Sequence, residues 1–212
     1  GWGKKHLSLI KKDSFFEEGK FIAVGSPMFN SPPKIKESNF KKINVIYAST
    51  RNDEPIIKAL ETFKKNNNNI SITIKVHPGE AIPDYLCEEI FHIEPGSFAI
   101  EDILDKYDIF ITPYSGSHIS AISEGLPVIF APFYYEFIQD LDSLYGINKE
   151  SMNLSYAENE DGLGNLLDKV VQDDKYRGQL ILQQVRYFNE LLSSNGRKES
   201  VSEIDEILAL EL

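Results

Sequence analysis

Two stretches of this sequence have the same pattern: ISITIKVHPGE, from Ile70 to Glu80, and DIFITPYSGSHIS, from Asp108 to Ser120. Each begins with a short apolar run rich in β-branched residues, which is typical of a buried strand. Each then breaks into small, polar and turn-forming residues. The first break contains His77 and the second contains the segment Ser115–His118. Both predicted strands therefore end in groups that can donate hydrogen bonds.

The same alternation of apolar strand and amphipathic helix extends through the middle of the chain. The predicted strands are apolar throughout rather than alternating, as expected when both faces of a sheet are covered. The pattern predicts an α/β fold with a Rossmann-like, doubly wound parallel sheet. The predicted strands are Lys42–Thr50, Ile70–Val76, Phe91–Pro95, Asp108–Thr112 and Leu126–Phe133, and the predicted helices are Asn52–Asn66, Ile82–Ile90, Ser97–Tyr107 and Ser117–Gly125.

The C-terminal part of the chain has a helical pattern without further strands. Residues Asp161–Ser194 predict two helices that are broken near Asp173–Gly178, and Lys198–Leu212 predicts one more amphipathic helix. We therefore expect extra C-terminal helices that pack on the sheet domain.

Composition narrows the class of protein. Of the 212 residues, 42% are hydrophobic and 26% are charged, which is ordinary for a globular protein. The net charge of −11 argues against a nucleic-acid-binding surface, which would need clustered Lys and Arg. The single cysteine, Cys87, cannot form an internal disulfide and indicates a reducing compartment. No apolar run approaches the roughly 18 residues of a membrane span, and no signal peptide is visible, so we expect a cytoplasmic protein.

Ligands of parallel α/β sheets bind beyond the carboxyl ends of the strands. Four predicted strand ends carry polar residues, at Thr50–Asn52, His77, Glu94–Gly96 and Tyr114–Ser117. The last of these also opens a helix, whose free backbone N–H groups favour an anion, and a phosphate is the natural ligand. His77 can hydrogen-bond the same phosphate or act as a proton donor, because histidine titrates near neutral pH.

Each of these signals also has a purely structural interpretation. A histidine before a proline, as in His77–Pro78, is usually half-buried in a turn, and Ser115 or Ser117 can serve as an ordinary helix cap. His118, inside the first helical turn, is more often a surface or supporting residue. A binding site is favoured because the His-Pro turn and the Ser-rich helix start fall at strand ends of one sheet.

Part of this sequence resembles the C-terminal, nucleotide-binding half of GT-B type glycosyltransferases, which have two Rossmann-like domains. The resemblance lies in three segments, KVHP, DIFITPYSGS and EGLPVIF. The resemblance is greatest to the bacterial capsule and cell-wall group, which includes CDP-glycerol glycerophosphotransferases, sialyl- and polysialyltransferases and Kdo transferases. The residues that carry it are Lys75, His77, Pro78, Asp108, Thr112, Tyr114, Ser115, Gly125, Pro127, Val128 and Ile129.

Three positions depart from the pattern of this group. Pro113 stands where Asp is common, Gly116 replaces a second Ser, and Ser120 stands where many relatives place an acidic residue that helps to hold the donor. The donor therefore stays open among CMP-, CDP- and UDP-linked sugars or polyol phosphates.

The resemblance also implies a division of the chain. Residues 1–41 resemble the linker between the two halves of such enzymes, residues 42–153 correspond to the Rossmann-like nucleotide-binding domain, and residues 154–212 supply the C-terminal helices. The 41 residues before Lys42 are fewer than the roughly 100 or more that a preceding domain needs. We therefore expect the active enzyme to require a second, N-terminal Rossmann-like domain.

The mechanism that the resemblance implies uses His77 as the catalytic residue and the positive field of the helix start to neutralise the leaving phosphate. No metal or cofactor is expected, and no Asp-x-Asp pair is visible. The partners are a nucleotide-activated donor and a glycan or lipid-linked acceptor for bacterial surface polysaccharide, and peripheral association with the inner face of the membrane is left open. The expected nucleotide- and phosphate-binding residues are Thr50, Glu94, Pro95, Ser115, Gly116, Ser117, His118 and Ser120.

Two other classes of function remain open at this stage. A nucleotide-sugar 2-epimerase shares this half-fold, and an Asp-Ser-Gly-Gly-x-x-x-Glu-Glu segment would favour it, whereas this chain has PYSGSHIS. A non-catalytic nucleotide-binding or interaction module would keep the fold without a second domain.

Overall fold

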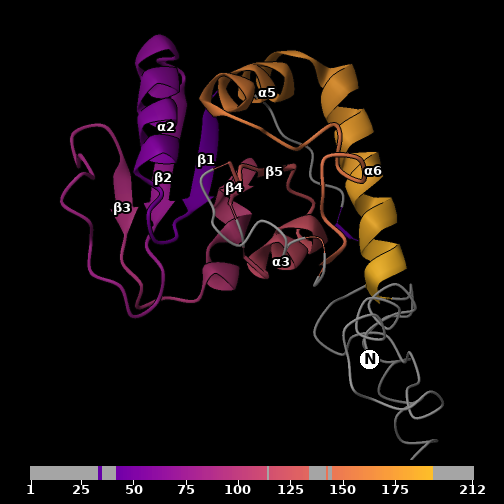
Figure 1. The fold of residues 1–212 in the computed structure, drawn as a ribbon, viewed down its shortest axis with the longest axis horizontal. Helices are drawn as coiled ribbons and strands as arrows, with labels where there is room; N and C mark the ends of the chain where they lie inside the picture. Colours follow the sequence, from indigo (N-terminus) through magenta and orange to yellow (C-terminus); the bar gives the residue numbers. More distant parts are fainter. Residues whose placement is uncertain (1–32, 35–41, 114, 134–141, 143–144, 193–212) are drawn as a thin grey trace, which may run out of the picture.

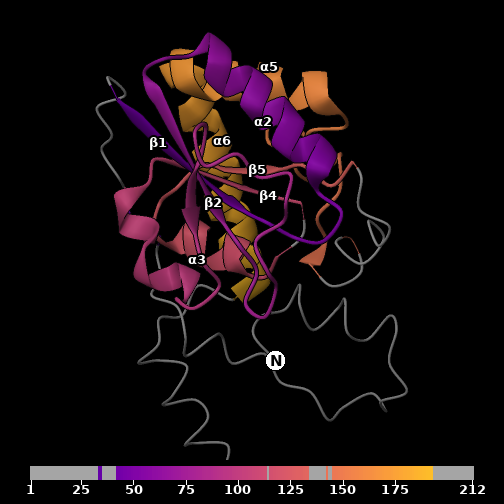
Figure 2. The same ribbon diagram turned by 90° about the vertical axis from the view of Figure 1, so that its left-hand side faces the viewer.

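The computed structural model describes residues 33–34, 42–113, 115–133, 142 and 145–192. This part of the chain forms a five-stranded parallel sheet in the order β3-β2-β1-β4-β5, with helices on both faces (Figures 1 and 2). The predicted doubly wound parallel sheet with extra C-terminal helices is therefore confirmed. The strands are β1 (Ile43–Ala48), β2 (Ile70–Lys75), β3 (His92–Glu94), β4 (Ile109–Thr112) and β5 (Val128–Phe130).

The central strand β1 explains why the strands are apolar along their whole length. It pairs with β2 on one side and with β4 on the other. Successive side chains of a strand point to opposite faces, so Val45 and Tyr47 enter the core on one face while Ile46 and Ala48 enter the core on the other. Because both faces are covered by helices, an alternating polar pattern would bury polar groups.

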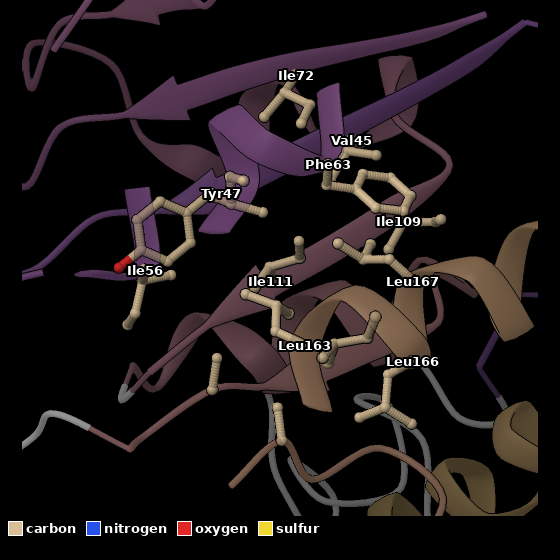
Figure 3. Packing of buried hydrophobic residues seen from close by; sticks show 14 of the residues in the cluster. Val45, Tyr47, Ile56, Phe63, Ile72, Ile109, Ile111, Leu163, Leu166 and Leu167 are labelled. Carbon is tan, nitrogen blue, oxygen red and sulfur yellow. The ribbon is translucent and has the colours of Figure 1, made fainter. Parts of the chain in front are cut away.

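Helices α2 (Glu54–Asn66) and α5 (Glu160–Gln172) cover the first face. Pro55 lies in the first turn of α2, where its missing N–H leaves no hydrogen bond unmade. Figure 3 shows apolar side chains of α2, such as Phe63, and of α5, such as Leu167, packed with the strand residue Ile109. The helix predicted over Asn52–Asn66 is confirmed, and its apolar residues Ile56, Ile57, Leu60 and Phe63 are all buried.

Helix α3 (Ser117–Ser123) lies on the second face, together with the C-terminal half of α6 (Asp174–Leu192). Gly125 follows α3 with a φ of 79°, a left-handed conformation that favours glycine, so the predicted helix stop is confirmed. Helix α6 runs along the β5 side of the sheet from the α5 side toward the α3 side (Figure 1). Consistent with this path, Leu180 packs in the first core and Phe188 in the second.

A buried glutamine fastens α6 to the strand at this edge of the sheet. The side chain of Gln184 is buried, and its Oε1 accepts the N–H of Val128 at 3.0 Å. Its Nε2 donates to the carbonyl oxygen of Val128 at 2.6 Å. One amide side chain thus satisfies the two backbone groups that a further strand would otherwise satisfy.

One predicted helix, Ile82–Ile90, is wrong. The segment forms turns, in one of which the N–H of Leu86 donates to the carbonyl oxygen of Pro83 at 3.0 Å. Helices this short are marginal unless tertiary packing supports them. Here the tertiary contact favours another conformation, because the Tyr85 hydroxyl is held at 2.7 Å by the buried carboxylate of Asp53.

A second predicted helix, Ser97–Tyr107, is also wrong. It contains two short 3₁₀ helices, η1 (Ile100–Asp102) and η2 (Leu104–Lys106). Ile103 between them has φ −124° and ψ −8°, outside the α-helical range, and Ala99 before them is extended. Burial of Ile103 and Leu104 against the sheet is achieved without a continuous helix.

The remaining sequence predictions concern segments only partly described. The predicted helix at Lys198–Leu212 and most of residues 1–41 lie outside the described residues, so the division into 1–41, 42–153 and 154–212 stays a prediction. Packing continues across residue 153, since Tyr156 forms a parallel bridge with Phe130 of β5. None of the helices in the described ranges has the length and apolar character needed to cross a membrane.

We predict that Gln184→Leu lowers the free energy of unfolding by about 2–4 kcal/mol, because it leaves a buried N–H and a buried C=O without partners. Gln179→Leu, at an exposed position of the same helix, serves as the control and should change stability by less than about 0.5 kcal/mol. Urea unfolding of the three proteins measures both effects. Equal stability of the two variants would contradict this account of how α6 is fastened.

Candidate functional site

A pocket of about 840 Å³ lies at the carboxyl ends of the parallel strands. Its lining comes from four segments that are far apart in the sequence: the loop after β1, the turn after β2, the segment around η1, and the start of α3. The structure thus brings three of the predicted sets together, namely Thr50, His77 and Ser115–Ser117. The lining residues are Ala48–Asn52, Lys75–Pro78, Glu80, Phe98–Glu101 and Ser115–Ser117.

His77 lies in a tight turn and is exposed to solvent rather than packed. The N–H of Glu80 donates to the carbonyl oxygen of His77 at 3.1 Å, and Gly79 takes a φ of 85° that only glycine adopts easily. Gly96 packs against this turn so closely that a Cβ there would lie 2.9 Å from the His77 carbonyl oxygen. The backbone around His77 is therefore fixed while its ring stays free to meet a ligand.

The two serines of the second predicted element bond to each other at the start of α3. The hydroxyl oxygens of Ser115 and Ser117 are 2.6 Å apart, and the N–H of Ser117 donates to Oγ of Ser115 at 3.3 Å. The cap position of α3 is Gly116, which makes no side-chain cap hydrogen bond. The structural interpretation therefore holds in part for Ser115, whose Oγ accepts the N–H of the first residue of α3.

His118 lies behind the pocket and does not line it. Its ring is fully buried, with Nδ1 at 2.6 Å from the carbonyl oxygen of Ser115 and Nε2 at 3.0 Å from the Tyr187 hydroxyl. A carbonyl only accepts, so Nδ1 carries the proton and Tyr187 donates to Nε2. The neutral ring links α6 to the Ser115–Ser117 segment, and burial lowers the pKa of His118 to about 4, against the opposing effect of the Ser115 hydrogen bond.

Three other predicted binding residues also stand outside the lining. The carboxylate of Glu94 accepts from His92 Nε2 at 3.1 Å, and the backbone oxygen of Pro95 accepts from Lys75 at 2.9 Å. Ser120 is buried and donates to Oε1 of Glu101 at 3.0 Å. Glu101 does line the pocket, so Ser120 contacts the pocket through it. Direct nucleotide contact by Glu94, Pro95 and Ser120 stays a prediction.

A buried carboxylate that the sequence analysis did not single out, that of Asp53, organises the loop after β1. Asp53 is 2% exposed and accepts from the Tyr47 hydroxyl at 2.8 Å, the Tyr85 hydroxyl at 2.7 Å and the Thr50 N–H at 3.0 Å. Burial, followed by these contacts with Asp53, raises the pKa of Tyr85 above its ordinary value. Asn52 in the same loop takes a φ of 61°. Asp53 therefore fixes the wall of the pocket without touching its interior.

The rim and floor of the pocket also carry residues to which the sequence analysis gave no binding role. Arg51 pairs with Glu80 at 3.0 Å, Phe98 is 56% exposed, and the Lys75 ammonium lies at the end of β2. The position of Arg51 after a predicted strand, and the place of Lys75 in the KVHP segment, were the sequence signals for these two residues. Within the described ranges, no group of three or more His, Cys, Asp or Glu side chains is placed to hold a metal ion.

Comparison with known proteins adds information at the level of the fold. No protein-family model and no curated protein sequence matches this chain. A solved structure of a variant of the wall teichoic acid polymerase TagF with CDPG matches 99% of this chain and 55% of its own, at 17% identity and a TM-score of 0.66. The glycotransferase of kitacinnamycin matches 83% of this chain and 46% of its own, at 13% identity and a TM-score of 0.53. S. aureus MnaA with UDP matches 81% of this chain and 48% of its own, at 15% identity and a TM-score of 0.51.

The chain has the fold of one half of a GT-B glycosyltransferase. The resemblance stated from the three sequence segments is confirmed at this level. The chain spans about half the length of these solved structures.

We predict that His118 makes the stability of the protein sensitive to acid. Its pKa is about 4 in the folded chain and 6.5 as the ordinary value, so between these pH values the unfolded chain binds a proton that the folded chain does not. The neutral His118 therefore contributes to the free energy of unfolding above pH 6.5. This contribution, about 3 kcal/mol, is lost as the pH falls toward 4.

The measurement is urea unfolding from pH 7 to pH 4 of the wild type and of His118→Asn, which cannot titrate. The wild type should lose about 3 kcal/mol more than the variant over this range. His92→Asn, at a histidine whose side chain is 65% exposed, is the control and should follow the wild type. Parallel curves for the wild type and His118→Asn would show that the prediction is wrong.

Proposed function

We propose that this chain is the nucleotide-binding half of a glycosyltransferase and holds a nucleotide-activated sugar or polyol phosphate in the pocket at the strand ends. One observation carries the proposal: the exposed His77 and the paired hydroxyls of Ser115 and Ser117 line the same pocket, although they follow different strands. The pocket volume of about 840 Å³ lies within the range of roughly 300–1,000 Å³ that is usual for small-ligand sites.

The residues present suit the departure of a phosphate leaving group. Negative charge grows on the phosphate as the bond to the transferred group breaks, and hydrogen-bond donors held in place beforehand stabilise that charge. His77 can donate a hydrogen bond or a proton from its fixed turn, and the hydroxyls of Ser115 and Ser117 can donate from the other segment. His77 is therefore proposed as the catalytic residue and Thr50, Ser115, Gly116 and Ser117 as phosphate- or nucleotide-binding residues.

The similar solved structures support a nucleotide as the ligand and a second domain as the partner. One of them was obtained with CDPG and another with UDP. Each is about twice as long as the part this chain matches, which supports a cleft formed with a second Rossmann-like domain. We propose a glycan or lipid-linked acceptor bound in that cleft, in the synthesis of a bacterial surface polysaccharide.

We predict that CMP, CDP and UDP bind the 212-residue chain, and that His77→Ala weakens this binding about 10-fold or more while the melting temperature stays nearly unchanged. The reason is that a charge-assisted hydrogen bond is worth about 1.5–3 kcal/mol. Ser115→Ala should weaken binding more mildly, because backbone N–H groups remain. The double variant should lose less than the sum, because both residues contact the same phosphate.

Calorimetric titration with parallel thermal melts tests this, with His92→Ala as the matched control at an exposed histidine outside the pocket lining. The control should bind as the wild type does. Unchanged nucleotide affinity in both His77→Ala and Ser115→Ala, or no binding to the wild type at all, would overturn the proposed function.

A further inference from the structure

Strand β2 ends in a lysine whose position is unusual for a charged residue. The neighbouring Ile74 is fully buried in the apolar core, and Lys75 itself is only 3% exposed. Even so, Lys75 belongs to the lining of the pocket. Lys75 thus lies at the floor of the pocket and is mostly screened from solvent.

The hydrogen bonds of this ammonium use only two of its three N–H donors. Nζ donates to the carbonyl oxygen of Pro95 at 2.9 Å and to that of Val76 at 3.1 Å. An ammonium carries three N–H donors, so one of them has no acceptor within the described ranges. No carboxylate of the described residues lies within ion-pair distance of Nζ.

The other charged groups of the pocket already have partners. Arg51 pairs with Glu80 at the rim, and Glu101 accepts the hydroxyl of Ser120. Lys75, by contrast, donates hydrogen bonds only to neutral carbonyl oxygens. Burial lowers its pKa against the weaker, opposite effect of the Glu94 carboxylate, with which it forms no ion pair. A buried cation without an ion-pair partner is costly, and such violations of folding rules concentrate at functional sites.

We propose that the Lys75 ammonium binds a phosphate oxygen of the ligand in this pocket and is the main counter-charge of its diphosphate group. The inference rests on the proposed function for the choice of a nucleotide. The inference goes beyond the proposed function because it assigns the ionic contact with the phosphates to Lys75, at the floor of the pocket. Because Nζ also holds the carbonyl of Val76, the residue before His77, the bound phosphate lies beside the His77 turn.

The test compares an anionic and a neutral ligand on matched variants of the full 212-residue chain. Lys75→Met removes the charge at similar volume, and Lys75→Gln keeps an N–H donor for the two carbonyls without the charge. Lys175→Met, at an exposed position of α6, is the control with the same change in net charge. The probes are CDP, cytidine and inorganic pyrophosphate, titrated by calorimetry with thermal melts beside them.

We expect both Lys75 variants to bind CDP and pyrophosphate about 10-fold or more weakly than the wild type. Cytidine affinity should change little, and Lys175→Met should match the wild type throughout. Wild-type affinity for CDP in Lys75→Met and Lys75→Gln would overturn the inference. So would equal losses for cytidine and CDP together with a lower melting temperature, because a purely structural tie between β2 and β3 has that effect.

The same titrations separate this inference from the proposed function. If the wild type binds pyrophosphate through Lys75 but binds neither CDP nor cytidine, the anion site stands and the proposed nucleotide site falls. If the wild type binds CDP and the Lys75 variants bind it equally well, the proposed function stands and the role of Lys75 falls. Absence of binding by all three probes overturns both.

Discussion

The parallel pairing of β1 with both β2 and β4 is the constraint on which the rest of the structure depends. It places the carboxyl ends of these strands at one edge of the sheet. It also creates a switch in topology, because the chain moves from β1 outward to β2 and β3 and then returns to place β4 on the other side of β1. Ligands of open α/β sheets bind at such a switch, and the pocket lies there, between the loop after β1 and the start of α3.

Polar groups buried behind the pocket hold its walls in place. Asp53 fixes the loop after β1, His118 joins the Ser115–Ser117 segment to Tyr187, and Gln184 fastens the same helix, α6, to β5. Each of these groups has hydrogen-bond partners inside the protein, as a buried polar network needs to be stable. The C-terminal helices therefore do more than cover the sheet, since α6 supports one wall of the site directly.

The fold could be predicted from the sequence because apolar runs bounded by turn residues fix the strands, and the parallel order follows from their alternation with helices. The prediction of helices over Ile82–Ile90 and Ser97–Tyr107 was wrong because tertiary contacts outweigh a weak local preference for helix. The contact of Tyr85 with Asp53 is an example. The sequence placed His77 and the serines at strand ends, which was sufficient to find the pocket. The burial of Lys75 and His118 could not be predicted, because it depends on segments that are distant along the chain.

The central claim is that the edge of the sheet around His77 and Ser115–Ser117 binds the phosphates of a nucleotide. Its most direct test is a map of backbone amide NMR shifts during titration with CDP. The account predicts concentrated shifts at the ends of β1 and β2 and at the start of α3, at Thr50, His77 and Gly116. Shifts confined to the surface between α2 and α5, where Lys58 and Asp161 lie, or no shifts at all, would contradict it.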